Sequence, residues 1–302
     1  ILALGGVLLW QGYYPLVPKS LITSEPSTSQ YIKTADSSKD FRAFRFWPGL
    51  KWNHEQGLSP EDYATQLDLE KELLFPNINI VYGIPIVDGD DNFMSSRMSR
   101  LSAQIGSIRA PQNEDKKWIG QESSPLEDRL DRFTSSENRS LLSLLGVKYI
   151  ATSLPFLPPF EKVFETSLAG TAIPIYIYKN KEAKPSVYFA KKVVFITSDD
   201  SEVWEALLAQ KDSGETVVIE CPDSHCDGEP TKASNSSITV LEKYPGYLRL
   251  GIRTKTPQWL VHSESNLPTW EALLRFATTS QKLPIFTSPG LTKFKLLARN
   301  AV

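Results

Sequence analysis

The first ten residues, ILALGGVLLW, form an apolar run that restricts what this chain can be part of more than any other stretch does. A transmembrane helix needs about 20 apolar residues, and the run holds about half of them. No basic region precedes it, as it would in a signal peptide. Trp10, Tyr13 and Tyr14 follow it, and aromatic residues are enriched where a helix leaves the hydrocarbon. We therefore expect residues 1–14 to be the end of a transmembrane helix; the alternative is a buried amino-terminal helix of a soluble domain.

Residues 15–39 are rich in Pro, Ser and Thr, which predicts a linker leading away from the membrane. The whole chain of 302 residues is 41% hydrophobic and 23% charged, a composition with room for one large or two modest cores. The formal net charge is -2 and the pI is about 6.0. Because this charge provides no general basic field, nucleic acid is not an expected partner.

Residues 40–230 mix strand and helix patterns and predict a mixed α/β extracytoplasmic domain. FRAFRFWP alternates with period two, which indicates a strand with Phe41, Ala43 and Arg45 on one face. A helix is expected to begin at Pro60, after Ser59 as its cap, and to end before Pro76. NINIVYGIPI reads as a short apolar strand.

The segment 125–146 predicts one helix or a pair of helices that ends at Gly146, and the strand VKYIAT follows it. A hairpin is indicated by EKVFETS and AIPIYIYKN, and a further strand is indicated by SVYFAKKVVFI. The stretch from that strand to TVVIE predicts a unit of strand, helix and strand. SITVLEKYP, GYLRLGIRT and PQWLVHSES then alternate as antiparallel strands do. We predict an α+β chain, with a mixed α/β domain followed by a small antiparallel β-sandwich over 231–302.

The common signatures of soluble enzymes are missing from the sequence: it contains no G-x-S-x-G, H-E-x-x-H, Walker or G-x-G-x-x-G motif. The histidines are His54, His225 and His262, and none has a recognisable catalytic setting. We expect His262 on the polar face of a strand, because it alternates with Leu260. No catalytic residue and no cofactor is assigned.

A carboxylate-rich segment is one candidate for ligand binding. Asp88, Asp90, Asp91 and Asn92 offer hard oxygen atoms that suit calcium or the hydroxyls of a sugar. The same residue types are ordinary in a tight turn. We favour the turn, because the spacing matches no complete calcium loop.

Aromatic residues near the predicted first strand are a second candidate. Phe44, Phe46, Trp47 and Trp52 have rings that can stack on sugars. Packing in the core is the favoured interpretation, because large aromatic side chains supply much of a fold's buried area. Trp47 and Trp52 are retained as candidate ligand-binding residues.

The cysteines, Cys221 and Cys226, lie in ECPDSHCDGE beside His225. Together these residues supply at most three metal ligands and lack the paired spacing of structural zinc sites. We therefore favour a loop disulfide or two free thiols over a metal. A disulfide would agree with an oxidising compartment outside the cytoplasm.

Several stretches, in order from Phe41 to Trp270, resemble the carboxy-terminal extracytoplasmic region of the YfhO-type bacterial membrane proteins. They are FRAFRFWP, FPNINIVYGIPIVDGDDNF, LLSLLGVKYIAT, IYIYKNKEAKPSVYFAKKV and YLRLGIRTKTPQWLVHSESNLPTW. The chain departs from the family's Pro-Gly-Trp pattern, because Thr269 stands between Pro268 and Trp270. The resemblance implies a multi-span cell-membrane protein of the GT-C glycosyltransferase class, which moves a sugar from a lipid-linked donor onto an acceptor outside the cytoplasm.

The resemblance also implies that the catalytic carboxylate lies in an early loop between membrane helices, which would precede Ile1. We expect this chain to be a non-catalytic extracytoplasmic domain of the cell envelope that positions an acceptor glycan or the membrane part. Its expected partners are its own membrane-embedded region and a glycan or lipid-linked sugar. Two alternatives remain: a structural or protein-interaction module without glycan binding, and an independent hydrolase using Asp88, Asp90 or Asp91.

Overall fold

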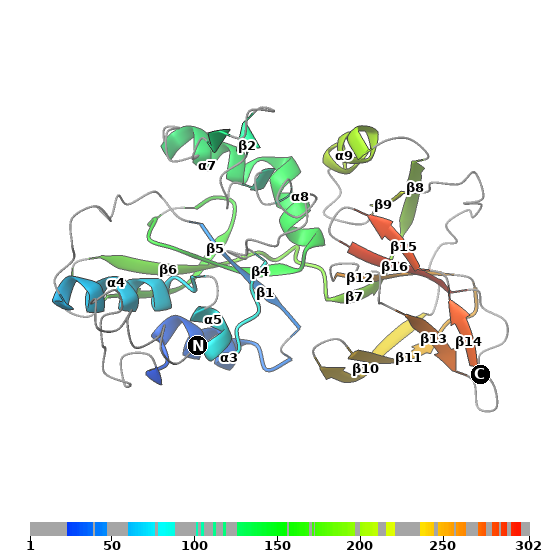
Figure 1. Cartoon of the computed structure of the whole chain (residues 1–302), viewed down its shortest axis with the longest axis horizontal. Coiled ribbons are helices and arrows are strands. Elements are labelled where there is room, and N and C mark those ends of the chain that lie inside the picture. The colour runs from blue at the N-terminus through cyan, green and yellow to red at the C-terminus, as the bar shows by residue number, and fades with distance from the viewer. Residues whose placement is uncertain are drawn as a thin grey trace, which may run out of the picture.

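The computed structural model shows a chain with helices and strands in two lobes, each built around one main sheet (Figure 1). This confirms the predicted α+β class. The residues that it describes are 23–38, 40–46, 60–75, 78–87, 101, 104–105, 111–112, 117–118, 126–155, 157–168, 171, 173–196, 200–210, 216–220, 236–244, 247–256, 258–263, 271–275, 280–283, 285–288 and 291–296.

The first lobe holds a four-stranded sheet with helices on both faces. Its strands, in spatial order, are β1 (Arg42–Arg45), β4 (Val147–Thr152), β6 (Pro174–Lys179) and β5 (Glu161–Ser167). One face carries α3 (Ser27–Ala35), α4 (Pro60–Glu72) and α5 (Ile78–Val81); the other carries α7 (Leu126–Thr134) and α8 (Ser136–Leu144) (Figure 1). β1 runs parallel to β4, whereas β6 is antiparallel to both β4 and β5.

Two local features fix the ends of α8, and the second of them is predicted from the sequence. The Ser135 side chain accepts a hydrogen bond from the backbone N–H of Asn138 at 3.3 Å, which caps the helix start. Gly146 has a φ of 72°, and a Cβ there would lie 3.1 Å from the Lys184 carbonyl oxygen. A glycine is therefore required where α8 turns into β4, which confirms the predicted left-handed cap.

The second lobe is built on a six-stranded sheet. In spatial order it contains β7 (Val187–Phe189), β12 (Gln258–His262), β16 (Leu291–Leu296), β15 (Ile285–Ser288), β9 (Thr216–Glu220) and β8 (Lys192–Ile196). The predicted strand, helix, strand unit is present, since β8 and β9 are parallel and α9 (Asp200–Leu208) connects them. The described residues also form three two-stranded sheets: β10 (Ser237–Tyr244) with β11 (Tyr247–Arg253), β13 (Ala272–Arg275) with β14 (Ser280–Leu283), and β2 (Pro111–Gln112) with β3 (Lys117–Trp118).

The sheets do not divide at residue 230 as the sequence predicts. β7, β8 and β9 precede that residue, yet they belong to the same sheet as β12, β15 and β16, which follow it. The chain passes from one sheet to the other between Lys179 and Val187. β10–β11 does pack against β7 and β12, with Ile238, Leu250 and Ile252 beside Val187 and Leu260. The face-to-face packing therefore includes β7, a strand that the sequence places in the first domain.

Two stretches fold differently from the prediction. Part of the expected linker is the helix α3, whose Ile32 is fully buried against the first sheet. INIV (Ile78–Val81) forms α5 in place of a strand, and the Asn79 side chain holds its end by donating to the Ile84 carbonyl oxygen at 2.6 Å. No helix within the described ranges is long and apolar enough to cross a bilayer, and residues 1–14 lie outside those ranges.

The amino end of α3 is capped by a carboxylate from α4. Glu72 accepts hydrogen bonds from the backbone N–H groups of Ser27 at 2.9 Å and Thr28 at 3.0 Å. Two otherwise unpaired helix donors and the positive end of the helix dipole thus meet a negative charge.

Glu72→Ala is expected to lower the free energy of unfolding by about 1–2 kcal/mol, because it removes both the cap and its charge. Urea titration followed by far-UV circular dichroism measures the loss. Glu165→Ala is the matched control, since Glu165 pairs with Lys162 on the surface, where its side chain is 54% exposed. Equal urea midpoints for the two variants would contradict the capping role.

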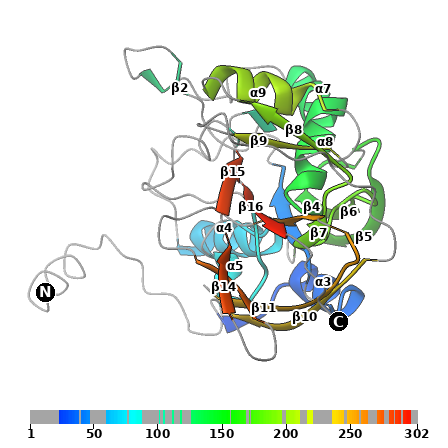
Figure 2. The ribbon, with the colours of Figure 1, turned by 90° about the vertical axis from the view of Figure 1, so that its right-hand side faces the viewer.

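One hydrophobic core runs through both lobes. It includes Phe44, Phe133 and Leu142 from the first lobe and Trp204 and Trp259 from the second. Figures 1 and 2 both show α9 of the second lobe beside α8 of the first, and these two helices are in contact. Because the buried side chains are shared, the two lobes form one packed body.

Candidate functional site

The eight side chains that the sequence singles out lie outside the described residues. They are Trp47, Trp52, Asp88, Asp90, Asp91, Asn92, Cys221 and Cys226. The described strands nevertheless fix where two of these segments leave the first sheet. The Phe46 N–H donates to the Ala151 carbonyl oxygen at 3.0 Å, and the Val87 N–H donates to the Ala43 carbonyl oxygen at 3.1 Å.

Phe46 and Val87 therefore lie at one edge of the sheet. Ile86 forms a parallel bridge with Ala43, so β1, β4 and the chain at Ile86 all point the same way. In open sheets of this kind, ligands bind outside the carboxyl ends of the parallel strands. The segments with the predicted tryptophans and carboxylates both begin at this carboxyl edge.

Two arginines flank the carboxyl edge. The guanidinium carbon of Arg45 lies 3.8 Å from the centroid of the Phe75 ring, and that of Arg129 lies 6.0 Å from the Phe46 ring. Arg45 is on the face covered by α4, and Arg129 is on the face covered by α7. Such cation–π contacts hold a positive charge beside each face of the edge.

The phenylalanines of the aromatic candidate cluster belong to the core. Phe44 is fully buried and Phe46 is 2% exposed. Their ring centroids lie 5.4 Å and 4.5 Å from that of Phe133. The core interpretation is therefore confirmed for these two residues, and neither ring is available to stack on a sugar.

His262 is buried, which corrects the predicted polar position. Only 5% of it is exposed, because β12 lies inside the second lobe with neighbours on both faces. No group of three His, Cys, Asp or Glu residues is close enough to hold a metal ion among the side chains that the structure describes.

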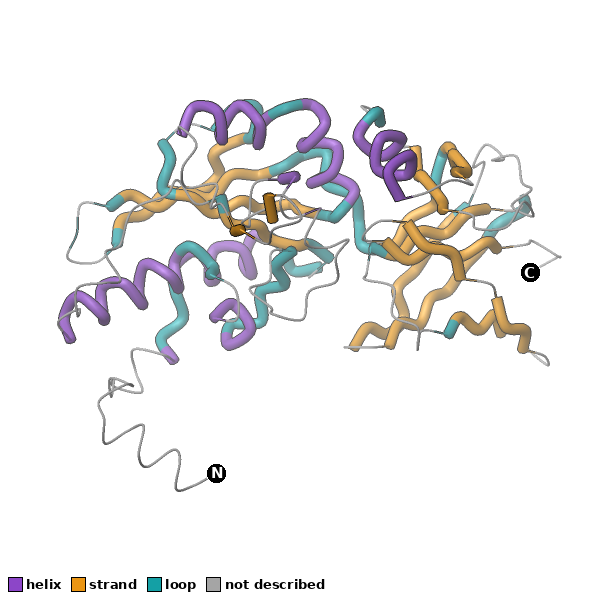
Figure 3. Tube along the Cα trace, turned by 45° about the horizontal axis from the view of Figure 1, so that its top comes forward, coloured by secondary structure: helices purple, strands orange, loops and turns teal. Residues whose placement is uncertain are grey.

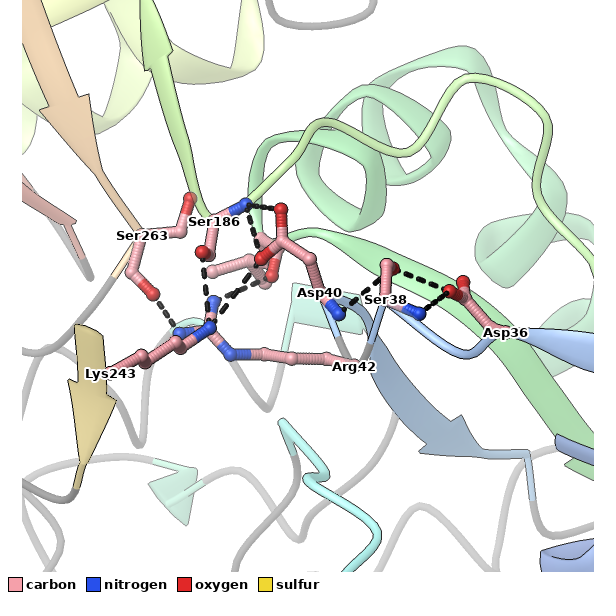
Figure 4. A network of polar contacts seen from close by, with 8 residues as sticks. Asp36, Ser38, Asp40, Arg42, Ser186, Lys243 and Ser263 are labelled. Atoms are coloured by element: carbon pink, nitrogen blue, oxygen red, sulfur yellow. Dashed lines mark hydrogen bonds and ion pairs between the residues drawn. The ribbon is translucent and has the colours of Figure 1, made fainter. Parts of the chain in front are cut away.

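A polar network joins the two lobes (Figure 4). We call Asp40, Arg42, Ser186, Lys243 and Ser263 the interlobe junction. The two carboxylate oxygens of Asp40 accept hydrogen bonds from the Ser186 N–H, both at 3.2 Å. Lys243 of β10 places its ammonium nitrogen 3.4 Å from Asp40 Oδ1 and donates to Ser186 Oγ at 3.1 Å.

Arg42 connects the lobes through backbone carbonyls. Its Nη1 donates to the Leu145 carbonyl oxygen at 2.8 Å, and its Nη2 donates to the Ser263 carbonyl oxygen. Ser263 in turn donates from its hydroxyl to the Leu144 carbonyl oxygen at 3.0 Å and from its N–H to the Ser186 carbonyl oxygen at 2.8 Å. One guanidinium thus ties the end of α8 to the end of β12.

Asp36 extends the polar contacts behind the junction. It accepts hydrogen bonds from Ser38 Oγ at 2.5 Å and from the Lys148 ammonium. Burial would raise the pKa of Asp36, but the hydrogen bonds from Lys148 and Ser38 and the Lys148 charge outweigh burial and leave the pKa lowered. The ionised form is therefore favoured in the folded protein.

We expect the wild type to lose stability in acid more steeply than Asp36→Asn does. A lowered pKa in the folded state stabilises the protein above the unfolded value of about 3.9, and this contribution is lost as the pH falls through the folded pKa. Urea midpoints measured from pH 7 down to about pH 3 test the difference. Asp131→Asn, at an exposed position of α7, is the control. A wild-type profile that falls no more steeply than that of Asp36→Asn would contradict the expectation.

Comparison of this chain with protein-family models, with curated proteins and with solved structures finds no match. The candidate site therefore rests on geometry. Sequence reasoning missed the interlobe junction because its residues lie in four separate segments between 40 and 263. The one available signal was that Ser186, Lys243 and Ser263 each lie in a predicted strand.

Proposed function

We propose that this chain is a non-catalytic extracytoplasmic domain of a multi-span membrane protein that resembles lipid-linked-sugar-dependent glycosyltransferases. It holds the acceptor glycan or the membrane part in position. The interlobe junction is the observation that supports this role most directly. Asp40, Arg42 and Lys243 use their charges to join the lobes.

A positioning domain must keep a fixed shape, because a misplaced acceptor loses the orientation on which rate depends. The shared core and the junction act together here. Each part of the junction crosses between segments that are far apart in the sequence, with 221 residues separating Arg42 from Ser263. The lobes are thus held in one relative orientation.

The carboxyl edge of the first sheet is the place where an acceptor would be held. Arg45 and Arg129 supply positive charge there, and the segments with Trp47 and Asp88 begin there. Aromatic rings, carboxylates and guanidinium groups are suitable partners for the faces and hydroxyls of sugars.

The test uses the full-length protein with a tag after Val302. Sugar transfer from lipid-linked donors is compared with and without residues 40–302, together with protease access to the tag on intact cells. We expect an accessible tag and a slower or misdirected transfer when the domain is removed. Transfer to the same acceptors at the same rate would contradict the proposal. Unchanged transfer with copurification of a protein partner would favour the structural module.

A further inference from the structure

Of the eight large hydrophobic side chains that are exposed among the described residues, six lie in α5 and the β10–β11 hairpin, and the others are Leu126 of α7 and Leu273 of β13. Ile80 and Val81 of α5 are 70% and 57% exposed, and Leu241, Tyr244 and Tyr247 of β10–β11 are 53%, 63% and 49% exposed. α5 belongs to the first lobe and β10–β11 to the second. Figures 1 and 3 show both elements on the lower side of their sheets. We call these five residues the lower apolar face.

The hairpin places apolar residues on both of its faces. Ile238, Leu250 and Ile252 face the six-stranded sheet. On the other face, the register shifts between Val240 and Glu242, and the Leu241 side chain comes within 3.7 Å of the position that a Cβ on Gly251 would take.

Tyr244 and Tyr247 are cross-strand partners on the outer face, with ring centroids 6.3 Å apart. These rings are not needed for the core, which the inner face already completes. An exposed apolar patch of this kind marks a surface of interaction.

Three ion pairs flank the lower apolar face. Glu25 lies 2.5 Å from Lys33, and Asp68 lies 3.0 Å from Lys71. On the hairpin, Glu242 is paired with Arg249. Paired charges cost less to bring close to hydrocarbon than isolated ones.

The described chain begins close to this face, and the apolar first segment precedes that point in the sequence. Burial raises the pKa of Tyr82, and so do the nearby negative charges of Asp68, Glu25 and Glu72. The end of α5 therefore lies near Glu25, two residues after the described chain begins at Thr23. Residues 11–22 separate Thr23 from Trp10, and twelve residues span at most about 40 Å.

We propose that the lower apolar face rests on the lipid bilayer, with Ile80 and Tyr247 at the membrane interface. The inference rests on the proposed function and deepens it, because it assigns the side of the domain that meets the membrane. Contact at two separate points on a rigid body suits a planar surface. Tyrosine is enriched at the membrane interface, where its ring is apolar and its hydroxyl is hydrated.

The experiment uses the whole chain in vesicles of phosphatidylethanolamine and phosphatidylglycerol. A fluorescent non-canonical amino acid replaces Ile80, Tyr247, Leu126 or Trp10, one at a time, so that Cys221 and Cys226 remain untouched. Leu126 of α7 is the matched control, since it is apolar, 38% exposed and on the opposite face of the first sheet. Lipids brominated near the headgroup quench labels that enter the interface, a layer of about 5–10 Å.

We expect strong quenching at 10, 80 and 247 and at least about twofold less at 126. Quenching at 10 without quenching at 80 and 247 would overturn this inference and leave the proposed function standing. Equal quenching at 80, 126 and 247 would also overturn it, because no face would then be preferred. A chain that shows no quenching even at 10 would contradict the membrane setting itself. Unchanged urea midpoints of the labelled proteins establish that each label leaves the fold intact.

Discussion

Phe133→Ala is expected to lower the free energy of unfolding by about 3–5 kcal/mol, because it removes a fully buried aromatic side chain. The ring lies 4.5 Å from Phe46, 5.4 Å from Phe44 and 6.0 Å from Phe160, measured between centroids. It is also the buried residue by which α7 contacts the core. The cavity therefore weakens both the packing of β1 and the attachment of this helix. Urea unfolding followed by tryptophan fluorescence measures the effect.

Leu126→Ala on the same helix is the control. Leu126 is 38% exposed, so its removal is expected to change stability by no more than about 0.5 kcal/mol. Because both variants place alanine in α7, any effect of helix propensity is similar in the two. Similar losses for both variants would show that α7 is not attached through Phe133.

The sequence predicts well the elements that local signals determine. The period of two identifies β1 and β10–β12, and proline at position 60 marks the start of α4. The pair α7 and α8 ends at Gly146, where a φ of 72° favours glycine and a Cβ would lie only 3.1 Å from the Lys184 carbonyl oxygen. Each of these signals is contained in a few neighbouring residues.

The elements that sequence reasoning missed depend on distant contacts. α3 forms in a stretch rich in Ser and Thr, because Glu72 caps it from 45 residues away and Ile32 enters the core. The position of the sheet boundary depends on pairings such as Thr287 with Glu220. No local sequence pattern indicates which residue will be the partner when the two residues are so far apart in the sequence.

The same distinction between local signals and distant contacts applies to the residues of the candidate site. Phe44 and Phe46 were correctly favoured as core residues, because burial of aromatic rings is the common outcome. The burial of His262 was missed, since strand alternation indicates one exposed face and β12 is covered on both. The tryptophans and carboxylates at the carboxyl edge stay predictions, because they lie outside the described residues.

Arg42→Ala is expected to lower the free energy of unfolding by about 2–4 kcal/mol, because it leaves the carbonyl oxygens of Leu145 and Ser263 without this donor. Each buried carbonyl that loses its partner costs about 1–3 kcal/mol. Arg42→Lys keeps the charge, but an ammonium does not reproduce the planar fork that reaches two carbonyls. The lysine variant should therefore recover only part of the loss. Urea unfolding of the three proteins measures the series.

A second measurement separates a loosened junction from a general loss of packing. The chain crosses between the lobes from Lys179 to Val187, so limited proteolysis in this crossing should increase in Arg42→Ala and not in Phe133→Ala at matched stability. Arg249→Ala is the control, since Arg249 is 54% exposed in its pair with Glu242 and its removal should have little effect. If Arg42→Ala and Arg249→Ala were cleaved equally, Arg42 would not be joining the lobes, and the rigid orientation on which the positioning role depends would have to come from the shared core alone.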